Sequence, residues 1–177
     1  MRLYSIWIEK MDNFIIENGV LLKYTGSDRN VKIPHGVTEI GESAFYSYLN
    51  LTSVAIPDGV VSIGASAFSD CAALESVSIP NSVRYIGDYA FYDCTRLYNV
   101  TVPHNTVVIG REAFSGCTRL TTVTLPDTLS DIGFMAFSFC PLIESVNYFG
   151  NEDDWNKIKI DEANDDLISA ERHYLKK

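Results

Sequence analysis

Positive charge is scarce in this chain of 177 residues, which carries 14 Lys and Arg side chains against 23 Asp and Glu. The net charge is −9, and no basic cluster stands out in the sequence. A protein that binds phosphates needs a basic face, and an acidic chain is repelled by anionic lipid. We therefore expect neither nucleic acid nor a lipid surface among its partners.

Long apolar runs are missing as well. No segment approaches the roughly 20 apolar residues of a membrane span, so we expect no membrane insertion. The first ten residues contain Glu9 and have neither the apolar stretch nor the small-residue cleavage site of a signal peptide. The chain is then cytoplasmic if it is complete, or the mature or excised part of a longer exported chain. The sequence leaves both open.

One interval of 23 residues dominates what is present. It separates five prolines, Pro34, Pro57, Pro80, Pro103 and Pro126, and five Ile-Gly pairs, from Ile40-Gly41 to Ile132-Gly133. It also separates five Ala-Phe pairs, from Ala44-Phe45 to Ala136-Phe137. A fixed period of this size predicts a solenoid in which each repeat packs only on its neighbours.

Each repeat contains two constant segments. The first reads Leu-x-x-Val-x-aliphatic-Pro, as in Leu51 to Pro57, and predicts one strand per coil, stacked in parallel about 4.8 Å apart. The second reads Ile-Gly-x-x-Ala-Phe-x-x-Cys. There we expect Gly to supply a backbone conformation that other residues resist, followed by one or two helical turns. The phenylalanines should form a stacked core column: Phe45, Phe68, Phe91, Phe114 and Phe137.

This pattern resembles the BspA-like class of leucine-rich repeats. The resemblance implies an α/β right-handed superhelix with a parallel sheet on its concave face, short helices or turns on its convex face, and a cap at each end. Residues 1–29 would form an N-terminal cap with a hairpin that turns at Asn18-Gly19. Residues 30–148 would hold about five to six coils, and 149–177 a C-terminal cap. It also implies proteins that act at a cell surface, or are secreted, in adhesion and protein recognition.

The cysteines and histidines offer little chemistry. Four cysteines also recur every 23 residues: Cys71, Cys94, Cys117 and Cys140. One column cannot give the converging ligands of a zinc site, so we expect buried reduced thiols, although disulfides between adjacent coils are not excluded by distance. His35 and His104 share a turn column three coils apart and cannot share a metal. We expect no catalytic residue, no metal and no cofactor.

The variable columns beside each strand are the candidate binding surface. Side chains there are small, polar and uncharged, and Arg96 and Tyr98 lie at the edge of the predicted sheet, with Arg119 one coil further on. Tyr and Arg are frequent interface anchors. The candidate ligand-binding residues are Ser53, Ser76, Ser78, Arg96, Tyr98, Asn99, Thr101, Arg119, Thr122 and Thr124.

Three functions remain open at this stage. The sequence favours a non-catalytic monomeric module that binds a protein or a glycan. The alternative is a structural spacer or stalk of a larger surface protein. An enzyme is the least favoured, because no catalytic site is visible.

Overall fold

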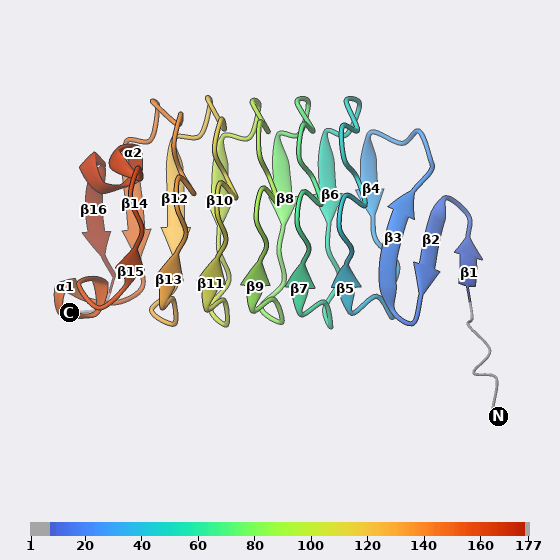
Figure 1. The fold of residues 1–177 in the computed structure, drawn as a ribbon, viewed down its shortest axis with the longest axis horizontal. Helices are drawn as coiled ribbons and strands as arrows, with labels where there is room; N and C mark the ends of the chain where they lie inside the picture. The colour runs from blue at the N-terminus through green and yellow to red at the C-terminus, as the bar shows by residue number, and fades with distance from the viewer. Residues whose placement is uncertain (1–7, 176–177) are drawn as a thin grey trace.

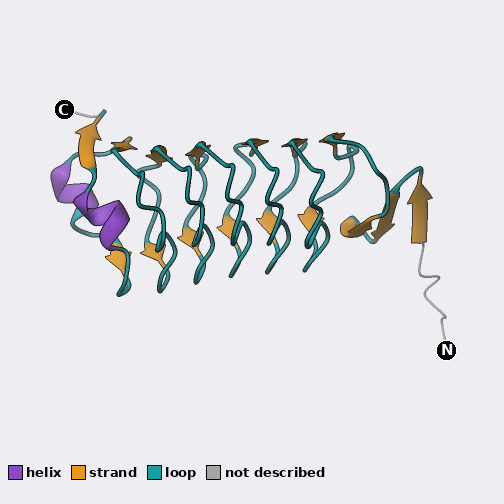
Figure 2. Ribbon diagram, turned by 90° about the horizontal axis from the view of Figure 1, so that it is seen from above, coloured by secondary structure: helices purple, strands orange, loops and turns teal. Residues whose placement is uncertain are grey.

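The computed structural model describes residues 8–175, which form a β-solenoid of about seven turns with its coils side by side in one row (Figures 1 and 2). Residues 1–7 lie outside this range, and with them most of the segment in which we expect no signal peptide. One sheet of nine strands and two shorter sheets run along the solenoid.

The chain begins with antiparallel strands β1 (Ile8–Met11), β2 (Phe14–Glu17) and β3 (Val20–Tyr24). Asn18 and Gly19 connect β2 to β3 with φ of 50° and 79°. Two positive φ values give the turn that matches the twist of a two-residue hairpin. The hairpin that the Asn-Gly pair predicts is therefore present.

The Ile-Gly segments form strands that the sequence analysis did not predict. Each coil adds one two-residue strand in parallel to the nine-stranded sheet, starting on β3, and the isoleucines face each other in register. The five strands are β5 (Glu39–Ile40), β7 (Ser62–Ile63), β9 (Tyr85–Ile86), β11 (Val108–Ile109) and β13 (Asp131–Ile132). The C-terminal segment adds β15 (Lys159–Ile160) to the same sheet.

The glycine in this segment is required for space and not for its conformation, so that expectation was wrong. Gly64 does not have a positive φ. A Cβ atom placed on it would lie 2.7 Å from the Ile40 carbonyl oxygen of the preceding coil. The backbones of successive coils pass too close here for any side chain.

The Leu-x-x-Val segments form parallel strands in register, as predicted. However, they make two sheets and not one, because β8 and β10 are not hydrogen-bonded as a ladder. The first sheet is β4 (Asn30–Lys32), β6 (Ser53–Ala55) and β8 (Ser76–Ser78). The second is β10 (Asn99–Thr101), β12 (Thr122–Leu125) and β14 (Ser145–Tyr148), to which the C-terminal segment adds β16 (Glu171–Tyr174).

The Ala-Phe segments are turns, so the expected helical turns are absent from the described repeats. Two residues of each turn have positive φ, as at Ser66 (53°) and Asp70 (59°), and this interrupts any helix. Alternate N–H groups of each turn donate to the next coil: Phe45 N bonds to the Ala67 oxygen at 2.8 Å, as Phe68 N does to that of Ala90. Each coil thus adds a third set of hydrogen bonds along the solenoid.

The phenylalanine column forms as predicted. The rings of Phe45, Phe68, Phe91, Phe114 and Phe137 stack with centroids 4.9 to 5.2 Å apart and interplanar angles of 5° to 15°. The last four of these side chains are fully buried. Tyr24 of the hairpin continues the column, 5.2 Å from Phe45.

Helices occur only at the C-terminal end of the described chain (Figure 2). These are α1 (Glu152–Trp155) and α2 (Asp165–Ser169). The side chain of Asn151 caps α1 by accepting a hydrogen bond from Asp154 N at 2.9 Å. Trp155 is buried, with its ring edge on to that of Tyr148. This contact packs α1 against β14.

Candidate functional site

The structure brings the predicted polar residues together in two columns on the outer surface of the Leu-x-x-Val strands. Their partners face each other strand by strand, for example Asn99 with Thr122 and Thr101 with Thr124. The side chains are exposed or half-buried. We call this surface the sheet face, and its predicted members are Ser53, Ser76, Ser78, Asn99, Thr101, Thr122 and Thr124.

The gap between the sheets divides the sheet face. β8 and β10 lie side by side (Figure 1), yet Ser76 and Ser78 belong to one sheet and Asn99 and Thr101 to the other. Val77 is half-buried at this junction, whereas Val100 in the next strand is buried. The expected continuous sheet is therefore interrupted between these two strands.

A shallow groove of about 320 Å³ lies over the first sheet. Its lining includes Asn30 and Lys32 of β4, which the sequence analysis did not include among the site residues. Asn30 Oδ1 accepts a hydrogen bond from Ser53 Oγ at 2.7 Å. The sequence does carry a signal for these two residues, because residues 30–34 read Asn-Val-Lys-Ile-Pro and fit the strand pattern of the later repeats.

The three edge residues are accessible, and one of them, Arg96, has an ion-pair partner. The Tyr98 side chain is 49% exposed, and Arg119 is exposed. Arg96 pairs with Glu75 at 3.8 Å, and both side chains are half exposed. Exposed pairs of this kind contribute little free energy, so Arg96 can exchange Glu75 for a ligand at small cost.

The four cysteines are buried and free, as predicted. Each thiol donates to a phenylalanine carbonyl oxygen 26 residues earlier, at 3.2 to 3.3 Å. Burial raises the pKa of the Cys71 and Cys140 thiols to about 12, and raises the pKa of Cys94 and Cys117 well above the ordinary value. A protonated, inaccessible thiol is neither a nucleophile nor a metal ligand at neutral pH.

The histidines are dispersed. His104 stacks at an angle on Phe149, with ring centroids 4.4 Å apart, and His173 Nε2 lies 4.0 Å from Glu171. His35 is exposed on a turn near the other end. Within residues 8–175, no three His, Cys, Asp or Glu side chains are grouped closely enough to hold a metal ion.

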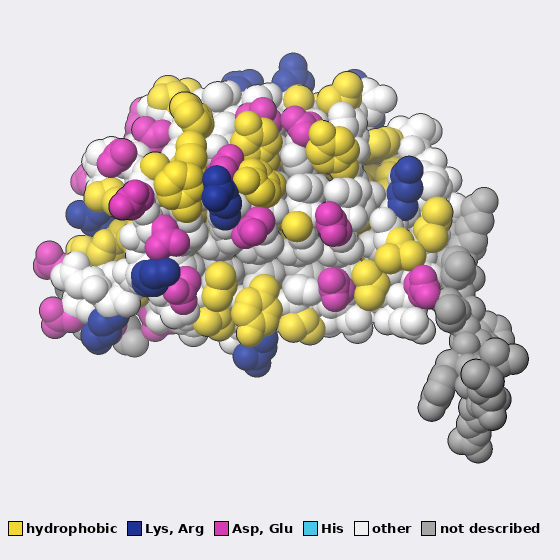
Figure 3. All heavy atoms as spheres, viewed as in Figure 1, with side chains coloured by type: hydrophobic (Ala, Val, Ile, Leu, Met, Phe, Trp, Pro, Cys, Tyr) yellow, Lys and Arg dark blue, Asp and Glu magenta, His cyan; other side chains and the backbone are white. Residues whose placement is uncertain are grey.

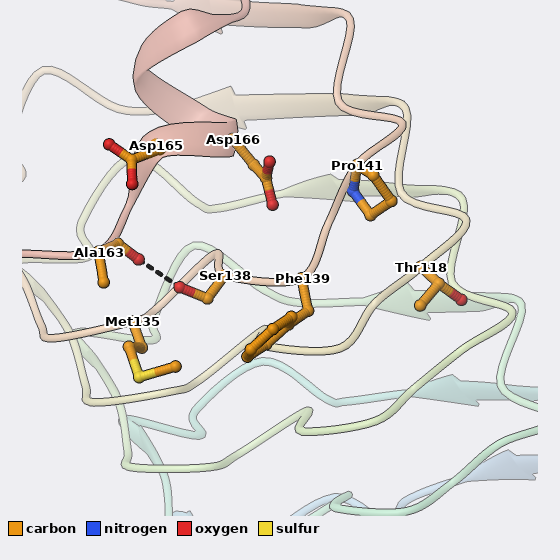
Figure 4. Close-up of a pocket in the computed structure, with 8 residues that line it drawn as sticks. All are labelled: Thr118, Met135, Ser138, Phe139, Pro141, Ala163, Asp165 and Asp166. Atoms are coloured by element: carbon orange, nitrogen blue, oxygen red, sulfur yellow. Dashed lines mark hydrogen bonds between the residues drawn. The ribbon is translucent and has the colours of Figure 1, made fainter.

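The C-terminal end contains a cavity of about 570 Å³ that the sequence analysis missed (Figure 4). Its walls come from the last two repeats, from Ala163 and from the start of α2. Figure 4 shows Met135 and Phe139 on one side of the opening, with Asp165 and Asp166 on α2 opposite them. The lining residues are Thr118, Met135, Ser138, Phe139, Pro141, Ala163, Asp165 and Asp166.

Side chains of the C-terminal segment replace backbone groups that a further repeat would supply. In earlier coils the phenylalanine N–H bonds to an alanine carbonyl, but Phe137 N donates to Asn164 Oδ1 at 3.0 Å. Asn164 Nδ2 donates to the oxygens of Gly133 at 3.0 Å and Asp161 at 2.9 Å. Asn164 is only 1% exposed, so it continues the ladder inside the core.

Charge is mixed over the face shown in Figure 3, where Lys and Arg side chains stand singly or in small groups among acidic and hydrophobic ones.

Among the helices of residues 8–175, none has the length and apolar character that crossing a bilayer requires.

Comparison with known proteins identifies the repeat. The family model for the BspA type leucine rich repeat region matches residues 16–144 in six copies. No protein with a curated description matches the chain.

Solved structures with the same fold come from several bacteria. The T. pallidum leucine rich repeat protein is 31% identical, with a TM-score of 0.71, over 81% of this chain and 67% of its own. A leucine rich cell surface protein from Faecalibacterium prausnitzii is 32% identical, with a TM-score of 0.82, over 88% of this chain. This chain spans only 43% of that protein. The 23-residue period, the phenylalanine column and these matches agree that the chain belongs to the BspA-type leucine-rich repeat family.

Proposed function

We propose that this chain is a non-catalytic interaction module that binds a protein or glycan surface through the sheet face. The sheet face would form the concave side of a right-handed solenoid whose two ends are capped. The observation that carries the proposal is the pair of in-register columns of small uncharged side chains beside the exposed Tyr98 and Arg119. Such a surface admits a partner closely, and its edge supplies residue types that often anchor interfaces.

The family supports this proposal, because leucine-rich repeats commonly mediate protein interactions. The cell-surface description of the Faecalibacterium prausnitzii protein supports a role at a cell surface. We propose that this role is adhesion. The sheet face offers no acid, base or nucleophile, so the proposed module acts by binding alone and takes no cofactor.

The test compares two double variants that make the same chemical change on different sheets. Tyr98→Ala with Thr101→Arg removes an exposed tyrosine and adds one positive charge on the sheet face. Tyr85→Ala with Val61→Arg does the same on the side of the nine-stranded sheet, where Tyr85 is 51% and Val61 41% exposed. The wild type and both variants are used as baits for surface-protein extracts and on a glycan array.

A ligand retained by the wild type and the control variant but lost by the sheet-face variant supports the proposal. Equal capture by all three proteins contradicts it. That result would instead favour the alternative function, a structural spacer of a larger surface protein.

A further inference from the structure

The last repeat differs from the others at the two turn positions that have positive φ. The first position is occupied by Ser43, Ser66, Tyr89, Glu112 and, in the last repeat, Met135. The second is occupied by Ser47, Asp70, Asp93, Gly116 and, in the last repeat, Phe139. Both positions therefore become apolar in the same repeat, four residues apart.

The fold itself does not explain Phe139. Its φ is 56°, a conformation in which bulky residues are rare and Gly, Asn or Asp is favoured. Its side chain is 65% exposed, so it gains little from the core. Ser47, Asp70 and Gly116 make the same turn without an aromatic ring. A strained, exposed aromatic at a cavity points to a role in binding.

The cavity has the size and chemistry for one kind of occupant. Its volume of about 570 Å³ lies within the roughly 300–1,000 Å³ of small ligand sites. Met135, Phe139 and Pro141 form an apolar wall, and Met is a side chain that adapts to irregular partners.

The charged side chains that line the cavity are acidic. Asp165 and Asp166 are its only charged lining residues, and both come from α2. Asp166 is held in place because its Oδ2 accepts a hydrogen bond from Cys140 N at 2.8 Å. A cation next to the apolar wall therefore has these two carboxylates as its charged neighbours in the lining.

We infer that this cavity binds an apolar side chain of a partner protein where that side chain stands next to a lysine or arginine. The apolar group lies against Met135 and Phe139, and the cation lies at Asp165 and Asp166. This site is separate from the sheet face, so it adds a second contact point and does not depend on the proposed function.

The three methionines of the chain provide a direct probe, because Met135 lines the cavity while Met1 and Met11 belong to the opposite end of the sequence. We would label the methionine methyl groups with ¹³C and add the peptide acetyl-Gly-Lys-Leu-Lys-Gly-amide. One control peptide replaces leucine by glycine, and a second replaces both lysines by glutamate. Met135→Leu assigns the signal.

We expect the Met135 methyl signal to shift saturably with the Lys-Leu-Lys peptide while the Met11 signal stays fixed. Phe139→Ser should weaken binding about 5-fold or more, since it removes an apolar anchor and leaves a residue type that this turn accepts in Ser47. Asp165→Asn should weaken binding about 2–5-fold, as expected for an exposed ion pair. Glu42→Gln, an exposed carboxylate in the first repeat, should change nothing.

Three results would overturn the inference. They are an unmoved Met135 signal at saturating peptide, an equal response to the glutamate peptide, or an equal response to the glycine peptide. Circular dichroism and the urea midpoint of each variant show whether the solenoid is still folded. Failure here would leave the Tyr98 experiment unaffected, because that experiment uses a different surface and different variants.

Discussion

The rings of Phe91 and Phe114 lie parallel, with centroids 5.1 Å apart and an interplanar angle of 5°. Each ring thus supports the next coil as well as its own. Phe91→Ala should lower the free energy of unfolding by about 3–5 kcal/mol, because it leaves a cavity in the middle of the column. Urea denaturation measures this, and Leu49→Ala, at a side chain that is 62% exposed, should stay within about 0.5 kcal/mol of the wild type. Equal losses for the two variants would contradict a continuous column.

Two glycines should respond differently to the same substitution. At Gly64 an added Cβ atom meets three backbone atoms at 2.7 to 2.9 Å, whereas at Gly59 it meets nothing within 4 Å. Gly59→Ala should cost only the strain of its φ of 99°, about 1–2 kcal/mol. Gly64→Ala should cost about 3 kcal/mol or more, because the clashing atoms belong to the backbone and cannot move aside. Thermal or urea unfolding of the two variants gives the comparison, and a larger loss at Gly59 would refute the close approach of the coils.

The buried thiols predict a loss of stability in alkali. Burial raises the pKa of Cys71 from 9.0 to about 12, so an unfolded chain releases this proton at a lower pH than the folded chain. The contribution of the thiol to stability is complete below pH 9 and falls by about 1.4 kcal/mol per pH unit between pH 9 and 12. Unfolding free energies at pH 8 to 10 should show a shallower slope for Cys71→Ala than for the wild type. Unchanged slopes would mean that the thiol ionises in the folded protein.

Asn164 should be sensitive because its side chain serves three backbone groups. Asn164→Ala leaves Phe137 N without its acceptor, whereas the Gly133 oxygen still accepts a hydrogen bond from Ala136 N at 3.2 Å. We expect a loss of about 2 kcal/mol, since an unsatisfied buried group costs roughly 1–3 kcal/mol. Asn105→Ala is the matched control, because its exposed side chain donates one hydrogen bond, to the Asn81 oxygen at 2.7 Å. Similar losses in urea unfolding for both variants would show that Asn164 does not hold the C-terminal segment.

The C-terminal segment should also keep the protein monomeric. Removal of residues 151–177 uncovers β13 and β14, whose backbone groups pair with β15 and β16 in the intact chain. Open strand edges and a bare core promote association, so the truncated protein should aggregate while the full chain stays a monomer in light scattering. A monomeric truncated protein with an unchanged melting temperature would reject the capping role. A concentration-independent dimer of the full chain would reject the monomer.

The buried side chains of the repeats could be predicted from sequence, whereas the backbone conformation of the repeats was predicted only in part. The phenylalanine column and the buried cysteines follow directly from the 23-residue period, and Asn18-Gly19 is a strong local turn signal. The left-handed turns were misread as helical because residues as different as Ser66, Tyr89 and Glu112 occupy one column, and glycine is absent from it. Periodicity reports which side chains are buried but carries little information on backbone φ.

In the candidate sites, the features that repeat could be predicted and those that occur once could not. The columns of the sheet face were visible as repeats, whereas the gap between β8 and β10 depends on how individual coils pack. Asn164 was hidden because it takes the place of a backbone carbonyl and resembles nothing in the earlier repeats. The cavity became visible only when α2 was placed opposite Met135 and Phe139.

The hydrogen bonds between coils have a consequence for the length of the array. Phe45 N reaches the Ala67 oxygen and Phe68 N reaches the Ala90 oxygen over the same span of 22 residues. Excision or duplication of 23 consecutive residues would therefore give every remaining coil an equivalent neighbour. Recombination within the gene can change the separation of the two ends in steps of about 4.8 Å, and the contacts between neighbouring coils stay the same. The separation of the two ends of the solenoid can therefore change during evolution while the fold stays the same.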